Sequence, residues 1–488
     1  MTGLFDEARY TAALERLDIT VLPLSLVRKR NEKLRIDSGY VSKESLRIDN
    51  SVRHYKGGVV DLGSLCNGFV KGIFDINASS YVEDGVPFVR IINLKDTLVD
   101  ESTLAFIPED IHESESKTAL QRGDFVISKT AYPAASVITL RRCNTSQDII
   151  AARLKPGASL NVETIVSFLN CCYGTGLMWR QFQGNVQMHL SLDDGRKIPI
   201  PCFGIGLQKA VASSVLKAER AFENSKAAMN EAEMMMLEAL DFGVPHSNPK
   251  TYVRSFADVF AVERLDAEYF SPAKYATLDL LNRGVAQPLG FHYASVRQMF
   301  DPSRAVEEFV RNFDVTDALR PMLNDTKEPS LAEEIGSVKK IMRDGDVVIS
   351  RLRSYLKEIA LVKTTSQIPM VGSSEFIVLR KTKDCTIDSQ VVLVFLRSLA
   401  VQTILKYSQD GSNHPRFAEE VLLSIPMPAC LSSVTFGKSL GHLVNRSLSE
   451  LEAGTVLLAA SKRAVEIAVE ESDEKAISYL EECERAST

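Results

Sequence analysis

The amino-acid sequence predicts a mixed α/β (α+β) fold, with two globular domains in tandem, two long antiparallel helices between them and a pseudo-two-fold internal duplication. Three observations carry this prediction. Short phrases occur twice in the same order, each copy passes from a β-rich region to a helical one, and each copy ends in a long segment with a helical apolar pattern. A chain of 488 residues is also too long for one hydrophobic core.

The duplication opens with the phrase RIDSGYVS at Arg35, which returns as RLDAEYFS at Arg264. Three further pairs follow in the same order: RGDFVISK (122–129) with DGDVVISR (344–351), SFLN (167–170) with VFLR (394–397), and KIPIP (197–201) with SIPMP (424–428). Four landmarks in one order indicate a tandem repeat of roughly 230 residues, not a solenoid of short units. We expect the Asp and Tyr of the opening phrase to be structural and to tie the start of each domain to the long helices.

The first part of each copy is rich in β-branched and aromatic residues, which are typical of strands. These segments are GVPFVRIINL (85–94) and GDVVISRLRSYLKEIALV (345–362). In the second segment, a period of two would place Arg351 and Arg353 on one strand face, with Tyr355 next on it.

A helical stretch follows in each copy, at 162–182 and 389–408, with apolar residues at helical spacing. The pattern IP-x-P then marks the exit from each globular part, because proline is excluded from helix interiors and central strands.

The last part of each copy predicts a long helix. From Leu207 to Leu240 there is no Gly or Pro, and a helix of that length would extend about 50 Å. Apolar rows repeat every seven residues in both copies: Val215, Phe222, Met229 and Met236, then Val444, Leu451, Leu458 and Val465. A second row is mostly small: Val211, Ala218, Ser225 and Ala232. Such rows predict two helices that pack lengthwise on each other. The alternative is that each helix buries its stripe on its own globular domain.

These boundaries predict five parts: an N-terminal variable or helical segment (1–34), a first globular domain (35–201), a first long helix (202–242), a second globular domain with its leading segment (243–428), and a second long helix with a C-terminal tail (429–488). The N-terminal segment has no counterpart among the repeated phrases. It is interpreted either as a helix beside the C-terminal tail or as a variable end.

Composition argues against several classes of protein. The hydrophobic fraction is 45% and the charged fraction 25%, as in ordinary globular proteins. No long apolar run or secretory signal pattern occurs, so we expect a cytoplasmic protein without a membrane segment. The eight cysteines are scattered without a CxxC pair, which argues against a zinc site. The net charge of −6 means that any basic surface is local.

No catalytic motif is complete. GTG (174–176) and GIG (204–206) do not extend to GxGxxG, there is no Walker lysine motif, and the Pro-Pro pair expected of a DNA amino-methyltransferase does not occur. In PEDIHESESK (108–117), Asp110, Glu115 and Lys117 imitate a nuclease acid cluster, but their spacing is too tight, so we expect a solvated loop. We therefore expect a binding or scaffolding protein that binds no metal or cofactor of its own.

The second copy presents its motifs in the order RLDAEYF (264–270), GDVVISR (345–351), SSEFIVLR (373–380), GSNHPRF (411–417) and IPMP (425–428), followed by a long helix. With its weaker first copy, the chain from Asp37 onward resembles the DNA specificity (S) subunit of type I restriction-modification systems. The resemblance implies two target recognition domains that each read one half of a bipartite site in double-stranded DNA. It also implies that the two helices set the spacing of the halves and dock two methyltransferase (modification) subunits.

The same resemblance places the cofactor outside this chain. S-adenosylmethionine would be held by the partner subunits, which methylate adenine N6, and an ATP-dependent restriction subunit is a further candidate partner. Two other classes stay open: a DNA-modifying or DNA-cleaving enzyme acting alone, and a scaffold, either for protein only or within another phage-defence methyltransferase complex.

Candidate DNA contacts come from local charge. The stretch 339–357 holds six basic residues and two acidic ones, and a recognition domain needs basic side chains for phosphates and base edges. The candidates are Arg351, Arg353, Tyr355, Lys357, Asn413, His414 and Arg416 in the second copy, and Lys71, Lys129 and Tyr132 in the first. The alternative for the arginines is a solvated edge strand. The first copy lacks a basic residue in the loop matching GSNHPRF, so a phosphate contact common to both loops is in doubt.

Overall fold

The computed structural model describes residues 22–28, 31, 33–74, 76, 78–184, 188–243 and 251–486. The chain divides into two compact units: unit one is Met1–Phe222 with Glu452–Thr488, and unit two is Glu223–Leu451. Both divisions fall inside the long helices, so each unit contains part of each helix. Most of the expected N-terminal segment lies outside the described residues, and its described part contains the short helix α2 (Leu24–Arg28).

The described residues of unit one form two four-stranded sheets. In order across the first sheet, the strands are β2 (Cys66–Lys71), β9 (Ile149–Leu154), β6 (Phe125–Ser128) and β7 (Ala135–Val137). The second sheet contains β4 (Ala105–Ile107), β3 (Val86–Val89), β8 (Arg142–Thr145) and β5 (Leu120–Gln121). Strands β3 and β8 are parallel. All four residues of β6 are buried, which explains why this central strand is uniformly apolar up to its last residue.

The described residues of unit two form two five-stranded sheets that repeat this plan. The first contains β12 (Tyr293–Ser295), β21 (Phe376–Lys381), β18 (Val347–Ser350), β19 (Ile359–Val362) and β15 (Met322–Leu323). The second contains β13 (Met299–Phe300), β17 (Lys339–Met342), β20 (Met370–Gly372), β14 (Phe309–Phe313) and β16 (Ser330–Leu331). The order β12-β21-β18-β19 matches β2-β9-β6-β7, and β14 is parallel to β20 as β3 is to β8. The mixed α/β fold with an internal duplication is confirmed.

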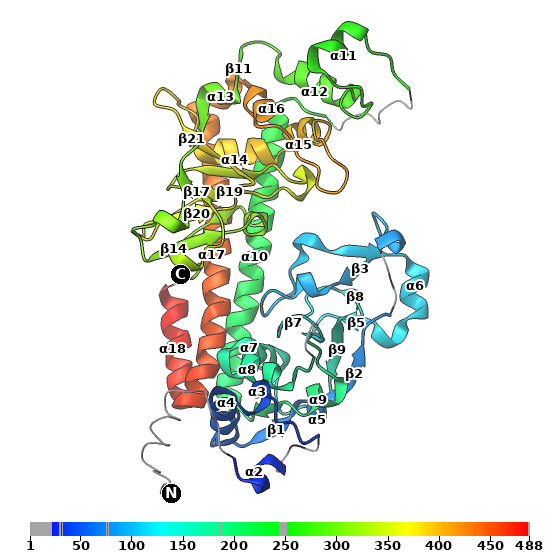
Figure 1. Ribbon diagram of the computed structural model, residues 1–488, viewed down its shortest axis with the longest axis vertical. Coiled ribbons are helices and arrows are strands. Elements are labelled where there is room, and N and C mark those ends of the chain that lie inside the picture. Colours follow the sequence, from blue (N-terminus) through cyan, green and yellow to red (C-terminus); the bar gives the residue numbers. More distant parts are fainter. Residues whose placement is uncertain are drawn as a thin grey trace, which may run out of the picture. The chain divides into compact units, whose positions relative to one another are not determined.

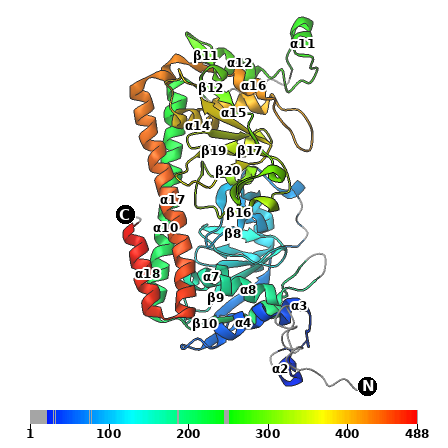
Figure 2. The same ribbon diagram turned by 60° about the vertical axis from the view of Figure 1, so that its left-hand side comes forward.

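Helices accompany the sheets in both units (Figures 1 and 2). In unit one they are α3 (Ser38–Val41), α4 (Lys43–Arg53), α5 (Leu62–Leu65), α6 (Glu109–Ser114), α7 (Val162–Asn170), α8 (Cys172–Gln181), α9 (Leu192–Arg196) and α18 (Asp473–Ala486). In unit two they are α11 (Phe256–Val262), α12 (Pro272–Leu281), α13 (Leu289–His292), α14 (Ser389–Arg397), α15 (Leu399–Lys406) and α16 (Glu419–Ser424).

Two details of the expected elements differ from the structure. Each helical stretch is broken into two helices, because Cys171 and Ser398 have extended backbone, and Ser398 also caps α15 by accepting from the Val401 amide. Each IP-x-P pattern is itself a short strand: β10 (Pro199–Pro201) pairs with β1 (Val59–Asp61), and β22 (Pro426–Pro428) with β11 (Ala286–Pro288). Proline fits there because each of these sheets has only two strands among the described residues.

The segment 108–117, expected to be a solvated loop, also forms regular structure. Helix α6 is followed by a 3₁₀ turn at Ser116–Thr118. The His112 ring is hydrogen-bonded to the buried Asn144 side chain of β8, which holds the helix against the sheet.

The long helices are α10 (Ile205–Ala239) and α17 (Val434–Glu470), and they run antiparallel and side by side in both views (Figures 1 and 2). In unit one, the Ser214 hydroxyl donates to the Leu457 carbonyl at 3.1 Å. In unit two, the Ser447 hydroxyl donates to the Ser225 carbonyl at 2.8 Å. Small side chains at these crossings let the two backbones approach closely.

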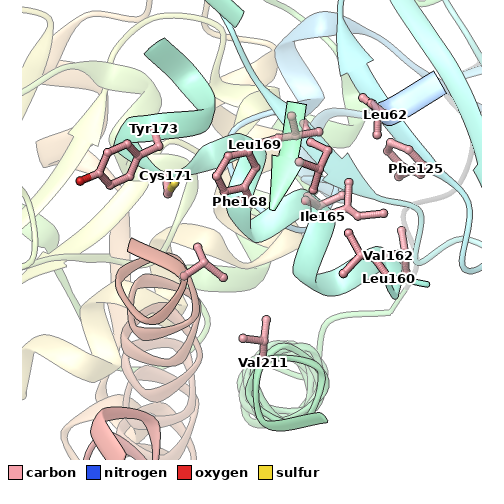
Figure 3. Close-up of a cluster of buried hydrophobic side chains, with 14 of the residues drawn as sticks. Leu62, Phe125, Leu160, Val162, Ile165, Phe168, Leu169, Cys171, Tyr173 and Val211 are labelled. Atoms are coloured by element: carbon pink, nitrogen blue, oxygen red, sulfur yellow. The ribbon is translucent and has the colours of Figure 1, made fainter. Parts of the chain in front are cut away.

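The seven-residue rows lie in the cores of both units. Six of these side chains are buried, namely Val215, Met229, Met236, Val444, Leu458 and Val465, while Phe222 and Leu451 are half-buried. The rows contact globular parts as well as the other long helix. Figure 3 shows Val211 of α10 pointing toward α7, which has seven of its nine residues buried and contributes Ile165 and Phe168 to the same cluster. Each long helix therefore packs both on the other long helix and on globular parts, so the two expected arrangements occur together.

The C-terminal tail forms α18, which packs on the long helices of unit one. Asp473 accepts hydrogen bonds from the Gly204 amide at 2.7 Å and from the Tyr55 hydroxyl at 2.5 Å. Ala476 and Leu480 are buried in the core of unit one. This carboxylate therefore caps the start of α10 from a distant part of the chain.

The opening phrase of each copy binds the end of a short helix and not a long helix, which corrects the expectation. We call this contact the clasp: the ion pair Arg35–Asp37 or Arg264–Asp266, with the backbone carbonyls that the arginine also binds. In unit one, Arg35 donates to both carboxylate oxygens of Asp37, and also to the carbonyls of Arg180 and Phe182 at the end of α8. Asp37 caps α3 by accepting from the Tyr40 amide. Carbonyls at a helix end lack intrahelical donors, so the guanidinium supplies them.

Candidate nucleic-acid interface

The candidate residues of unit two lie on two loops, and the same two loops occur at matching places in unit one. In unit one, Lys129 and Tyr132 lie on the first of these loops, and Lys71 is the last residue of β2 (Cys66–Lys71). One loop joins β6 to β7 in unit one and β18 to β19 in unit two. Its third residue has a left-handed backbone in both units: φ is 65° at Ala131 and 44° at Arg353. The second loop follows the helix pair, and it contacts the first loop through isolated bridges, Thr130 with His189 and Leu352 with Arg416.

The prediction that Arg351, Arg353 and Tyr355 share a strand face is wrong. Strand β18 ends at Ser350, and Tyr355 lies in a 3₁₀ turn (Ser354–Leu356). Arg353 and Lys357 both have left-handed backbone, because the chain must reverse direction between two antiparallel strands.

Glu375 is the centre of the unit-two loops. Its Oε2 accepts from Arg351 Nε at 2.7 Å, and its Oε1 accepts from Arg416 Nη2 at 2.8 Å. Hydrogen bonds from Arg416 and then from Arg351 lower the pKa of Glu375 to about 2. The carboxylate therefore stays ionised at neutral pH and holds two guanidinium groups of the two loops together.

Further basic side chains surround this centre. Arg297 pairs with Glu419 at 3.3 Å. Burial lowers the pKa of Lys340 on β17, and the positive charges of Arg351 and Arg297 act in the same direction. Arg353 Nη2 lies 3.0 Å from His414 Nδ1, and Asn413 contributes its carbonyl at 3.4 Å.

Unit one carries a related arrangement at equivalent positions. Asp148 precedes β9 as Glu375 precedes β21. The Lys129 amide donates to the Asp148 carbonyl at 2.7 Å, as the Arg351 amide does to the Glu375 carbonyl at 3.1 Å. Burial lowers the pKa of Lys129, and the charge of Lys71 lowers it further. In both units, the first residue of this loop is thus basic and lies beside an acid, Asp148 in unit one and Glu375 in unit two.

The strand registers relate Lys71 to Arg297. Lys71 pairs with Ile150, the second residue of β9. Ser295 pairs with Leu379, so the continued register places Arg297 opposite Ile377, the second residue of β21. The first-copy lysines and the second-copy arginines are therefore structural counterparts, and so are His189 and Arg416 through their bridges.

The remaining candidates have different surroundings. Tyr132 is 40% exposed, and its hydroxyl donates to the Ile91 carbonyl at 3.0 Å. Tyr355 is 62% exposed. Lys357 is turned toward α10, where its ammonium lies 3.0 Å from Glu233. Lys357 thus belongs to the packing of its loop on the long helix, and we do not retain it as a DNA contact.

The sequence did not point to Glu375, Asp148 or Arg297, and Lys340 was counted in the basic stretch 339–357 without being made a candidate contact. Glu375 lies in the motif SSEFIVLR (373–380), but an acid that precedes a strand has no distinctive spacing. Aligning the copies on β9 and β21 would have shown that both units keep an acid there. The described residues contain no group of three or more His, Cys, Asp or Glu side chains that could hold a metal ion.

Among the described residues, no individual helix is long and apolar enough to cross a membrane, although α14 and α15 pass together as a bent pair by length and composition. Almost every residue of these two helices lies buried or half-buried in unit two.

Comparison with known proteins found solved structures but no sequence relatives. No family model matches the chain, and no curated protein matches it. A type I restriction-modification S subunit from M. genitalium is 12% identical, with 86% of this chain and 95% of that chain covered and a TM-score of 0.36. The HsdS subunit from Thermoanaerobacter tengcongensis is 14% identical, with 89% and 98% covered and a TM-score of 0.27. These two proteins are both S (HsdS) subunits.

Proposed function

We propose that this chain is the non-catalytic DNA specificity subunit of a type I restriction-modification, adenine-N6 methyltransferase complex. The observation that carries the proposal is the duplicated basic site. Lys71 and Lys129 of unit one correspond to Arg297 and Arg351 of unit two, and an acid lies beside Lys129 and beside Arg351 at the equivalent position, Asp148 and Glu375. Each unit would read one half of a bipartite sequence in double-stranded DNA.

Local charge supports DNA as the ligand. Phosphate neutralisation supplies most of the sequence-independent affinity of DNA-binding proteins. In unit two, five basic residues, Arg297, Lys340, Arg351, Arg353 and Arg416, lie near the acids Glu375, Glu419 and Glu358. The chain as a whole carries −6, so this concentration of positive charge is a local feature.

The long helices would set the spacing between the half-sites and dock two methyltransferase subunits. Helices α10 and α17 each contribute to both units. A change in their length would therefore change the distance between the two reading sites. S-adenosylmethionine would be bound by the methyltransferase subunits, and an ATP-dependent restriction subunit would join the same complex.

The test is binding selection with the full chain and its methyltransferase partner on a library of random DNA duplexes. The proposal predicts enrichment of two short sequence blocks separated by a gap of constant length. The absence of any sequence preference would overturn it in favour of a protein scaffold. Methyl transfer or strand cleavage by the chain without its partner would overturn it in favour of an enzyme acting alone.

A further inference from the structure

The guanidinium group of Arg351 is held on one side only. Its Nε donates to Glu375 Oε2 at 2.7 Å. Neither Nη1 nor Nη2 has a hydrogen-bond partner among the described residues, and the side chain is 45% exposed. The outer edge of this fork therefore presents two parallel N–H donors to solvent.

The neighbouring arginines do not share this arrangement. Arg416 uses Nε and Nη2 on Glu375, and its Nη1 donates to the His414 carbonyl at 3.2 Å. Arg353 uses Nη2 on the loop that contains Asn413 and His414. Arg416 thus holds Glu375 in place, and Glu375 in turn anchors the Nε edge of Arg351.

This fixed fork limits what Arg351 recognises. Two parallel donors require two adjacent acceptors, and guanine is the base that presents such a pair, O6 and N7, in the major groove. An arginine that is already fixed loses less rotamer freedom when it binds. Its counterpart in unit one is Lys129, whose ammonium is a point donor and cannot form the same pair.

We infer that Arg351 reads a guanine in the half-site of unit two through Nη1 and Nη2, and that Glu375 is the positioning residue for this contact. The inference rests on the proposed DNA-recognition function and goes beyond it by naming a base and a side chain. A phosphate oxygen pair is the other ligand that suits such a fork, and the experiment separates the two.

The experiment repeats the duplex selection with the full chain and its methyltransferase partner, using wild type, Arg351→Lys, Glu375→Gln and the control Arg304→Lys. Arg304 is an exposed arginine of unit two outside this cluster, with a side chain that is 86% exposed. Wild type and the control should both require guanine at one position of one block. Arg351→Lys keeps the charge but loses the fork, so this requirement should fall about 10- to 100-fold while the other block is unchanged.

The Glu375→Gln variant distinguishes a positioning role of Glu375 from a purely structural role. Loss of the carboxylate frees Arg351 and raises the local positive charge. The guanine requirement should therefore fall while affinity for random duplex at low salt rises. If Glu375→Gln instead weakens binding to the selected motif and to random duplex by the same factor, Glu375 serves fold stability, and its positioning role is overturned.

Replacement of the required guanine by 7-deazaguanine keeps Watson–Crick pairing and removes the N7 acceptor. Wild type should lose about 10-fold or more in affinity on this duplex, and Arg351→Lys should lose little. If wild type selects a motif but Arg351→Lys selects the same one with equal strength, Arg351 contacts phosphate and the inference fails. If wild type selects no motif, the proposed function itself fails.

Discussion

Arg264 and Asp266 form a close ion pair, with 2.7 Å between Nε and Oδ2, and this pair repeats the one between Arg35 and Asp37. The Arg264 guanidinium also donates to the Ser408 and Gln409 carbonyls beyond α15. Both copies thus contain the same clasp, an Arg–Asp ion pair that binds the chain at the end of α8 in unit one and just beyond α15 in unit two.

The clasp predicts a large local stability effect. Arg264→Ala should lower the free energy of unfolding of unit two by about 1–3 kcal/mol, because it leaves the Ser408 and Gln409 carbonyls without this donor and Asp266 without its partner. Chemical denaturation of the full chain, followed by hydrogen exchange of α15, measures this. Arg304→Ala is the control, and equal effects of the two variants would show that the clasp does not stabilise unit two.

Lys274 makes the clasp of unit two sensitive to pH. Its ammonium lies 3.2 Å from the centre of the Tyr269 ring, and burial lowers its pKa to about 8 from an ordinary 10.5. At Lys274 the unfolded chain therefore holds more of the proton than the folded chain between these values, so the contribution of Lys274 to stability should rise as pH rises from about 8 to 10.5. Lys274→Met should remove this contribution, so the difference in unfolding free energy between wild type and variant should grow in favour of wild type from about pH 8 to 10.5. A difference that does not change with pH would contradict the assignment.

Substitution of Arg353 should change DNA affinity in a different way from substitution of Arg351. Because Arg353 is bonded to its neighbouring loop, we expect it to contact phosphate. Arg353→Ala should weaken binding to all duplexes by a similar factor, and the slope of log affinity against log salt should fall by about one. Titrations between low and high salt measure the slope. A loss confined to one base position would instead assign Arg353 to base recognition.

The long helices predict a change of spacing. Matched seven-residue insertions in α10 and α17 preserve the seven-residue rows and lengthen the pair by about 10 Å. The gap between half-sites should grow by about three base pairs, since one base pair takes about 3.4 Å, while both half-site sequences stay the same. An unchanged gap in the selected duplexes would refute the spacing role.

The sequence predicted the duplication and the long helices because both leave periodic signals along the chain. The partners of Arg35 and Arg264 were not predictable, since these are backbone carbonyls that carry no side-chain signature. The turn at Arg353 was read as a strand because its residues have β propensity, whereas the strand pairing forces a reversal there. Lys357 was misplaced for a related reason: its partner Glu233 lies 124 residues away on α10.

The most direct test of two equivalent reading sites is to map methylated adenines in cells that express the complex with wild type, Lys129→Ala or Arg351→Ala. Wild type should give one bipartite motif, with a change in only one half for Lys129→Ala and in only the other half for Arg351→Ala. A contiguous motif, or changes in both halves from either substitution, would contradict this prediction.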